Sequence, residues 1–121
     1  MITRKNFLKT SILAIPAIAI AQSSTAKAVP LIGGYGLTNN ASMLANYIIN
    51  NYPGVQSVGG VRPDRLPDHP SGHAIDIMIG SNMSLGDTIR NDIQSQSGRF
   101  GVKYILWRVP NHFNHVHVTV Y

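Results

Sequence analysis

Hydrophobic and polar residues alternate in two segments of the chain, and each alternation predicts a β-strand. From Ala74 to Ile79 the isoleucines occupy every second position, which places Asp76 on the opposite face. From His115 to Tyr121 the valines alternate in the same way and leave two histidines together on one face. If these strands are neighbours with their apolar faces toward helices, the acidic and imidazole side chains gather on the other side of the sheet.

Two further segments have the spacing of amphipathic helices. Asn39 or Asn40 can cap the first helix, and Pro53 ends it. Ser84 can cap the second helix, which Gly98 ends. The apolar residues at helical spacing are Met43, Leu44, Tyr47 and Ile48 in the first helix and Leu85, Ile89 and Ile93 in the second.

The remaining segments predict short or irregular structure. Val29 to Leu37 is rich in glycine and is expected to be an irregular lead-in, and Arg62 to Ser71, with three prolines, is expected to be a loop. Val55 to Val61 and Val102 to Trp107 favour strands, and Pro110 to Asn114 favours a turn. The fold class expected is α+β: a small antiparallel sheet with two helices packed on one face and a candidate zinc site on the other.

Residues 1–28 have the pattern of an export signal. A basic start precedes an apolar stretch from Ser11 to Ala21, and Ala26 to Ala28 forms an A-x-A cleavage site. The stretch is too short to span a bilayer, so no stable membrane span is expected after cleavage. The start also resembles the twin-arginine consensus, but Lys5 replaces the second arginine and leaves the route open. The expected mature chain, residues 29–121, is a single domain, secreted or retained in the cell envelope.

Composition excludes several classes of site. The chain has no cysteine, which excludes thiolate zinc fingers, disulfide frameworks and cysteine nucleophiles. All its acidic residues are aspartates, so a His-Glu-x-x-His helix is excluded and a general base must be an aspartate or a histidine. Four of the ten basic residues lie in the leader, and the rest of the chain has a net charge of only +1. A nucleic-acid partner is therefore not expected. The protein is expected to be a monomer.

Residue types that bind metals recur in the second half of the chain. His69 and Asp76 are seven positions apart, and His115 and His117 follow in a distant segment. Two imidazoles and a carboxylate make a three-ligand zinc site whose fourth position holds a water with a lowered pKa. From spacing alone, His69 can instead be a surface loop residue, with His115 and His117 both reaching one ion.

These residues also match a family pattern. The motif pair is His69-x-x-Gly72-x-Ala74-x-Asp76 followed by His115-x-His117. It resembles the zinc-peptidase group that contains lysostaphin-type endopeptidases, D-Ala-D-Ala carboxypeptidases of the VanY type, the penicillin-insensitive murein endopeptidase and the hedgehog signalling domain. The resemblance covers residues 67–117 and implies a fold similar to that of the hedgehog domain and the D-Ala-D-Ala peptidases.

The resemblance also implies roles for the histidines and the aspartate. His69, Asp76 and His117 would be the ligands of Zn²⁺. His115 would lie beside the metal as a general base or transition-state stabiliser, and His112 is a second candidate for that role, because the murein endopeptidase branch places histidines around its site.

Residues near the motif include a candidate substrate-binding arginine and two departures from the family pattern. Arg62 resembles the arginine that meets a substrate carboxylate in the carboxypeptidases, and a guanidinium suits such bidentate recognition. It could equally form a surface ion pair with Asp64 or Asp68. Pro67 replaces the serine of the family motif, and His73 is expected to face solvent. The glutamate base of the carboxypeptidase branch is absent.

The function expected is therefore that of an exported zinc metallopeptidase. Its substrate would be D-Ala-containing bonds in the stem peptides of peptidoglycan, cut as a carboxypeptidase or as a cross-link endopeptidase. An alternative is a non-catalytic zinc-binding module of the cell wall or of signalling, as in the hedgehog branch. A secreted metal-dependent nuclease built on His112, Asn114 and His115 is a third reading, which the small net charge disfavours.

Overall fold

Three helices and five strands form within residues 28–121, the part of the chain that the computed structural model describes. The expected leader, residues 1–28, lies outside the described residues except for its last position. The elements are β1 (Leu31–Ile32), α2 (Asn39–Asn51), β2 (Ser57–Gly59), β3 (Ala74–Met78), α3 (Met83–Ser95), α4 (Ser97–Phe100), β4 (Val102–Leu106) and β5 (His115–Val120). The α+β class predicted from the sequence is confirmed.

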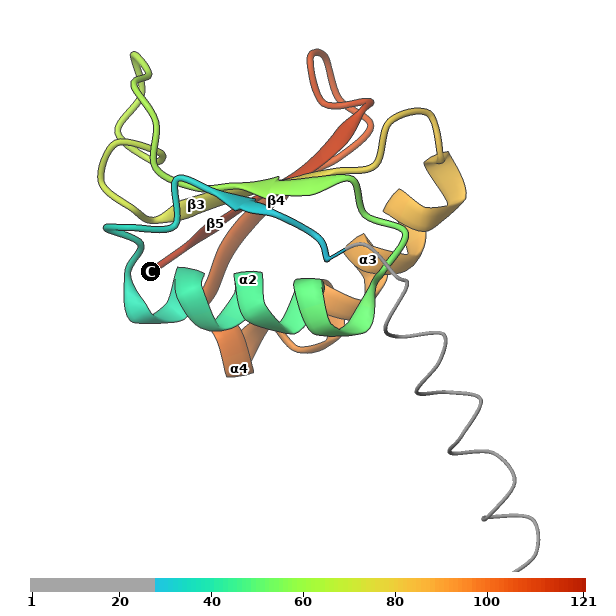
Figure 1. The fold of residues 1–121 in the computed structure, drawn as a ribbon, viewed down its shortest axis with the longest axis horizontal. Helices are drawn as coiled ribbons and strands as arrows, with labels where there is room; N and C mark the ends of the chain where they lie inside the picture. Colours follow the sequence, from blue (N-terminus) through green and yellow to red (C-terminus); the bar gives the residue numbers. More distant parts are fainter. Residues whose placement is uncertain (1–27) are drawn as a thin grey trace, which may run out of the picture.

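The five strands form one mixed sheet in the order β1-β2-β3-β5-β4 (Figure 1). The prediction of a purely antiparallel sheet is wrong at one edge, where Leu31 of β1 pairs in parallel with Val58 of β2. This edge strand lies inside the segment expected to be an irregular lead-in. Only two residues pair there, and so short a strand shows no alternation that the sequence could reveal.

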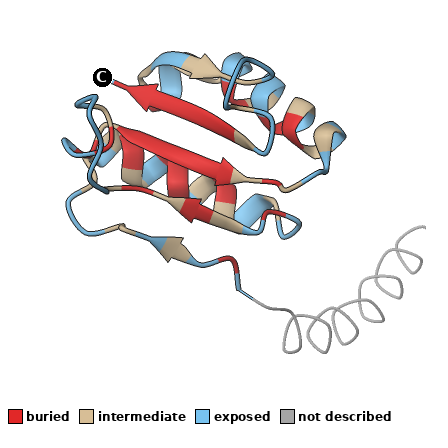
Figure 2. Ribbon diagram, turned by 90° about the horizontal axis from the view of Figure 1, so that it is seen from above, coloured by how far each residue is buried: buried red, intermediate tan, exposed pale blue. Residues whose placement is uncertain are grey.

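Strands β3 and β5 occupy the centre of the sheet and pair antiparallel. Ile75 lies opposite Val118, and Asp76 lies opposite His117. Because directly paired residues share a face, the isoleucines and valines lie on one side of the sheet and the aspartate and histidine on the other. Figure 2 shows that burial is concentrated along these central strands. The two alternations read from the sequence therefore describe one sheet.

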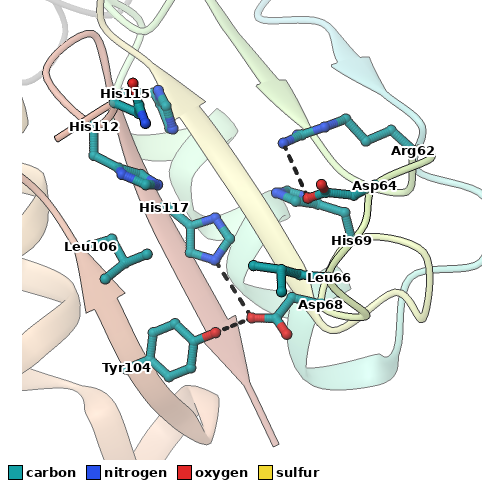
Figure 3. Close-up of a pocket in the computed structure, with 11 residues that line it drawn as sticks. Arg62, Asp64, Leu66, Asp68, His69, Tyr104, Leu106, His112, His115 and His117 are labelled. Carbon is teal, nitrogen blue, oxygen red and sulfur yellow. Dashed lines mark hydrogen bonds and ion pairs between the residues drawn. The ribbon is translucent and has the colours of Figure 1, made fainter.

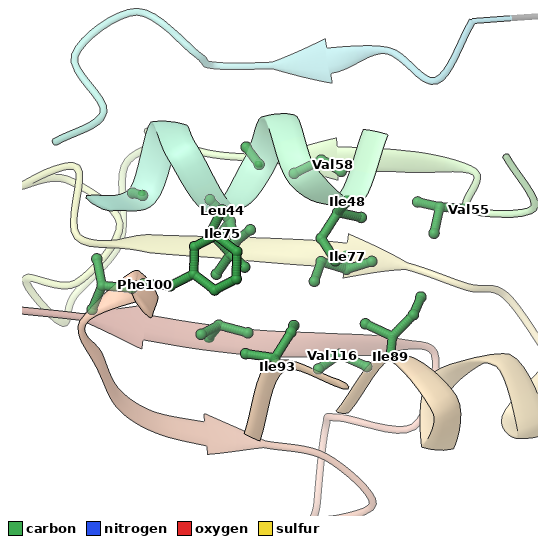
Figure 4. Packing of buried hydrophobic residues seen from close by; sticks show 14 of the residues in the cluster. Leu44, Ile48, Val55, Val58, Ile75, Ile77, Ile89, Ile93, Phe100 and Val116 are labelled. Atoms are coloured by element: carbon green, nitrogen blue, oxygen red, sulfur yellow. The ribbon is translucent and has the colours of Figure 1, made fainter. Parts of the chain in front are cut away.

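The helices cover only the apolar face of the sheet. Leu44 and Ile48 of α2, Ile89 of α3 and Phe100 of α4 are fully buried and point toward Ile77 and its neighbours (Figure 4). Burying such a side chain contributes about 1.5–3 kcal/mol. No helix within residues 28–121 is long and apolar enough to cross a membrane.

The ends of the helices differ in detail from the predictions. Thr38 caps α2 by accepting from the Ala41 amide, so the cap lies one residue before Asn39. Asn82 caps α3 by accepting from the Leu85 amide, in place of Ser84. The second helix ends at Ser95, and Gly98 lies within a third, one-turn helix, α4. Neighbouring Thr, Ser and Asn residues all suit a cap, so sequence alone does not select one.

A β-bulge shifts the faces of the edge strand β4. Val102 pairs with Val120, but Tyr104 pairs with Thr119, which leaves Lys103 as an extra residue. An unbroken alternation from Val102 would direct Lys103, rather than Tyr104, to the polar face. The bulge therefore brings the Tyr104 phenol onto the same face as Asp76.

One close approach joins α3 to the end of β4. A Cβ built on Gly86 would lie 2.3 Å from the Trp107 ring. Because a glycine here leaves room for the indole, the helix packs directly against the ring. Gly98, an exposed residue of α4, has nothing within 4 Å of the same added atom.

This difference predicts opposite effects for two Gly→Ala substitutions. Gly86→Ala overpacks the Trp107 contact and should lower the free energy of unfolding by about 1–3 kcal/mol. Gly98→Ala, the matched control, should raise it by about 0.5–1 kcal/mol through helix propensity and a less flexible unfolded chain. Urea denaturation of both variants measures the two values. A Gly86→Ala protein as stable as the Gly98→Ala protein would contradict the packing described.

Candidate metal centre

The polar face of the sheet carries a cavity of about 260 Å³. Two loops flank it: residues 60–73, which follow β2, and residues 107–114, which precede β5 (Figures 1 and 3). Its lining includes Arg62, His69, Tyr104, His112, His115 and His117. Every site residue predicted from the sequence except Asp76, which lies buried beneath, therefore contributes to the wall of one cavity.

Asp76 is the centre of the polar cluster. Its Oδ1 lies 2.9 Å from His117 Nδ1, and its Oδ2 lies 3.2 Å from His69 Nε2. All three side chains are buried, and one ligand atom from each lies within 4.8 Å of the others. The structure thus brings together the three residues predicted as ligands in a group that could hold a metal ion.

The hydrogen bonds of His69 make one of its nitrogens available as a ligand. Its Nδ1 lies 2.9 Å from the Gly60 carbonyl oxygen, which can only accept, so Nδ1 carries a proton. Nε2, although close to Asp76, has no hydrogen-bond partner among the described residues. A buried imidazole nitrogen beside a carboxylate oxygen needs a proton or a metal ion between them. Donation from the second nitrogen to a carbonyl is also the usual arrangement of a metal-binding histidine.

The loop that carries His69 is anchored to the start of α2. Gly72 has φ +81°, and a Cβ there would lie 2.2 Å from the Gly36 carbonyl oxygen. The Gly72 carbonyl accepts from the amide of Thr38, and its own amide donates to the His69 carbonyl. The glycine of the motif is thus required by a close approach of two backbones, and this contact fixes the loop beside the sheet.

Two imidazoles and a guanidinium surround the Asp76 carboxylate. Burial alone would raise its pKa, but His117, His69 and the Arg62 guanidinium hold the pKa well below its ordinary value. Arg62 Nη1 donates to Asp76 Oδ2 at 2.6 Å, while Arg62 Nη2 is 3.9 Å from Asp64. Arg62 therefore belongs to the site, and its pair with Asp64 is the weaker contact. Burial lowers the pKa of His69, but the adjacent carboxylate more than compensates, so the pKa is raised.

His115 and His112 stand at the rim of the cluster (Figure 3). His115 Nδ1 lies 2.7 Å from Asn114 Oδ1, and its Nε2 is 3.7 Å from Asp76 Oδ1. His112 Nδ1 donates to the Pro110 carbonyl, and the rings of His112 and His115 are 4.9 Å apart. Burial lowers the pKa of His115, which favours the neutral imidazole.

A hydrogen-bonded chain behind His117 was not predicted from the sequence. His117 Nε2 lies 2.8 Å from Thr119 Oγ1, which donates to Asp68 Oδ2 at 2.7 Å. The Tyr104 hydroxyl donates to the same carboxylate oxygen. This hydrogen bond is the main cause that holds the pKa of Asp68 below its ordinary value; burial opposes it and Thr119 adds to it. The alternation in β5 could have placed Thr119 on the face that carries His117. The bulge in β4 breaks the alternation that would have placed Tyr104 there.

His73 does not join the group. Its Nδ1 lies 2.8 Å from Ser71 Oγ, and it lines a separate hollow with Lys103 and Tyr121. It is half-buried, so the expectation that it faces solvent is met only in part.

The turn that carries His112 is held from the helix layer. The Arg108 amide donates to the His112 carbonyl, and Arg108 itself has φ 59°. The Arg108 guanidinium binds both oxygens of Asp87 at 2.9 Å, and Trp107 Nε1 donates to Asp87 Oδ1 at 2.8 Å. A carboxylate on α3 thus fixes the end of β4 and the start of the turn.

Comparison with known proteins identifies a family. The family model described as VldE, C-terminal domain, matches residues 33–113. The matched range includes Arg62, His69, Asp76 and His112 and ends before His115. No curated protein and no solved structure matches the chain.

The Asp87 contacts predict a pH dependence of stability. Arg108 and Trp107 lower the pKa of Asp87 from 3.8 to about 2. A carboxylate with a depressed folded-state pKa stabilises the protein above its unfolded pKa, and that contribution is lost as the pH falls through the folded value. Asp87→Asn should therefore be less stable than the wild type at pH 5, and the difference should shrink between about pH 4 and pH 2. Urea denaturation across this range measures it, and Arg108→Gln should reproduce it. A difference that stays constant would contradict the contact.

Proposed function

We propose that this chain, which belongs to the family described as VldE, C-terminal domain, is a zinc-dependent peptidase that cuts D-Ala-containing bonds in peptidoglycan stem peptides. The family description names a domain and no activity, so the proposal rests on the site. One observation carries it: two buried imidazoles face the two oxygens of one buried carboxylate beside an open cavity.

The donor set fits the proposed ion. His69, Asp76 and His117 supply two nitrogens and one carboxylate, the combination typical of catalytic zinc, which leaves a further coordination position for water or substrate. The unpartnered His69 Nε2 is independent support, because a metal would satisfy it. A zinc ion bound there would lower the pKa of a coordinated water and polarise a substrate carbonyl.

His115 is proposed as the general base. Its Nδ1 is engaged by Asn114, so Nε2 is the nitrogen that remains to exchange a proton at the cluster. Its lowered pKa keeps the ring neutral at pH 7, as a proton acceptor requires. In this role His115 takes a proton from the attacking water and returns it to the leaving amine. His112, whose ring contacts that of His115, is the second candidate.

Arg62 is proposed to bind a carboxylate of the substrate. Its side chain is half exposed and lines the cavity. A guanidinium at this place can form paired hydrogen bonds with the terminal carboxylate of a D-Ala residue. The substrate class itself comes from the motif resemblance and the expected export of the chain. The same resemblance includes the hedgehog branch, and the lack of glutamate makes a non-catalytic zinc module the second candidate function.

The ligand assignment predicts the metal content of purified residues 29–121. The wild type should retain about one zinc per chain after dialysis, and Asp76→Asn and His117→Gln should lose it, because each removes one of three ligands. His73→Gln, a histidine outside the group, is the matched control and should retain the metal. Elemental analysis measures the content, and circular dichroism verifies folding. A folded Asp76→Asn protein with unchanged zinc content would contradict the assignment of Asp76 as a ligand.

Catalysis is tested on purified sacculi. Zinc-loaded wild type should release stem-peptide products, and His115→Ala should reduce kcat about 10²–10⁴-fold while retaining zinc, because it removes a proton-transfer group. Arg62→Gln should mainly raise KM, because it removes the proposed contact with the substrate carboxylate. Release of terminal D-Ala indicates a carboxypeptidase, whereas conversion of dimers to monomers indicates an endopeptidase. Zinc-loaded protein that leaves sacculi intact yet binds them would favour the non-catalytic module.

A further inference from the structure

His117 is bounded by polar groups at both ring nitrogens. Nδ1 lies 2.9 Å from Asp76 Oδ1, and Nε2 lies 2.8 Å from Thr119 Oγ1. A neutral imidazole carries a single proton, and only the nitrogen without it can bind a metal. The partner that holds this proton therefore decides which nitrogen of His117 is available.

The direction of the hydrogen bonds places the proton on Nε2. Thr119 has one hydroxyl hydrogen, and Asp68 Oδ2, 2.7 Å away, can only accept it. The Thr119 oxygen is then an acceptor toward His117, so Nε2 must donate. Asp76 Oδ1 is also an acceptor, so a metal ion bound at Nδ1 takes the place of a proton there. With the reverse arrangement, the Thr119 and Asp68 oxygens would face each other in a partly buried place without a hydrogen between them.

Two further contacts hold Asp68 in this position. The Tyr104 hydroxyl donates to the same oxygen of Asp68, and the Tyr104 ring stacks near that of His117, with centroids 6.1 Å apart and planes 18° apart. Tyr104 reaches this face because of the bulge at Lys103, and Thr119 does so because it follows His117 by two positions in β5. Three elements thus converge behind one imidazole: β4, β5 and the loop that carries His69.

We propose that Thr119 and Asp68 are positioning residues for the metal centre. Thr119 accepts a hydrogen bond from His117 Nε2 and donates to Asp68, so the Nε2 proton is retained and Nδ1 is the nitrogen that binds the ion beside Asp76. This inference rests on the proposed function, because it concerns the same metal site. It adds a set of residues, Thr119, Asp68 and Tyr104, that bind no metal and set the affinity for it through His117. Outer partners of this kind typically change metal affinity about 10–100-fold.

A pair of substitutions at one position tests the proposal. Thr119→Val has nearly the same shape, suits a strand and cannot accept a proton from Nε2, so the dissociation constant for zinc should rise about 10–100-fold. Thr119→Ser keeps the hydroxyl and should restore an affinity close to that of the wild type. Titration against a chelator of known affinity measures the constants. A purely structural role would not distinguish a folded valine variant from the serine variant in this way.

A spectroscopic readout locates the proton directly. In the zinc-loaded wild type, two-bond ¹⁵N–¹H NMR spectra of labelled histidine should show His117 protonated at Nε2. Asp68→Asn, a second variant in case Thr119→Val does not fold, should weaken zinc binding in the same direction. Because Asp68 acts through Thr119, combining the two substitutions should weaken binding less than the sum of their separate effects.

The outcomes separate this inference from the proposed function. Equal zinc affinity in the wild type and Thr119→Val, or a proton on Nδ1 in the zinc-loaded wild type, overturns the role of Thr119 and Asp68 and leaves the metal site standing. A wild type that binds no zinc overturns the metal site itself. A wild type that binds zinc but cuts no peptide overturns only the peptidase, and the affinities of the Thr119 variants still decide the positioning role.

Discussion

The pairing register of β3 and β5 is the constraint on which the rest of the structure depends. Asp76 lies opposite His117 in this pair of strands, and the flanking isoleucines and valines are buried against the helices. A slip of one residue would exchange the two faces, expose the apolar side chains and bury the polar group in the core. The core and the polar cluster are therefore specified together, because each residue that fills one face sets the position of its neighbour on the other.

The loop that carries His69 adds the third member of the cluster from outside this pair. It is held by backbone contacts at Gly72 with the start of α2, and by the bond from His69 Nδ1 to Gly60. Arg62, on the same loop, reaches the carboxylate from the cavity side. The geometry around Asp76 thus depends on both the sheet and the helix layer, so a change at the first turn of α2 can alter the cluster without contacting it.

The sequence predicts the parts of this arrangement that repeat and misses those that depend on a single residue. Alternation in β3 and β5 identified both central strands, their faces and the meeting of Asp76 with the histidines of β5. It missed β1, which is too short to alternate, and the choice of helix caps among neighbouring polar residues. The residues that hydrogen-bond behind His117 could not be predicted for a different reason. Tyr104 reaches this place only through the bulge at Lys103, and Asp68 reaches it only through the fold of its loop. Neither leaves a periodic trace in the chain.

The bulge at Lys103 also makes the pairing register of β4 important for the polar cluster. A regular ladder that retained Lys103 and continued from the Val102–Val120 pair would place Lys103 opposite Thr119, turn the phenol of Tyr104 toward the helices and remove a hydrogen-bond donor from Asp68, while altering no residue of the cluster around Asp76. A change of register at this edge therefore affects the polar cluster as a substitution within it would. Strand β4 should therefore tolerate a change of the exposed Lys103 side chain more readily than a shift in its pairing with β5.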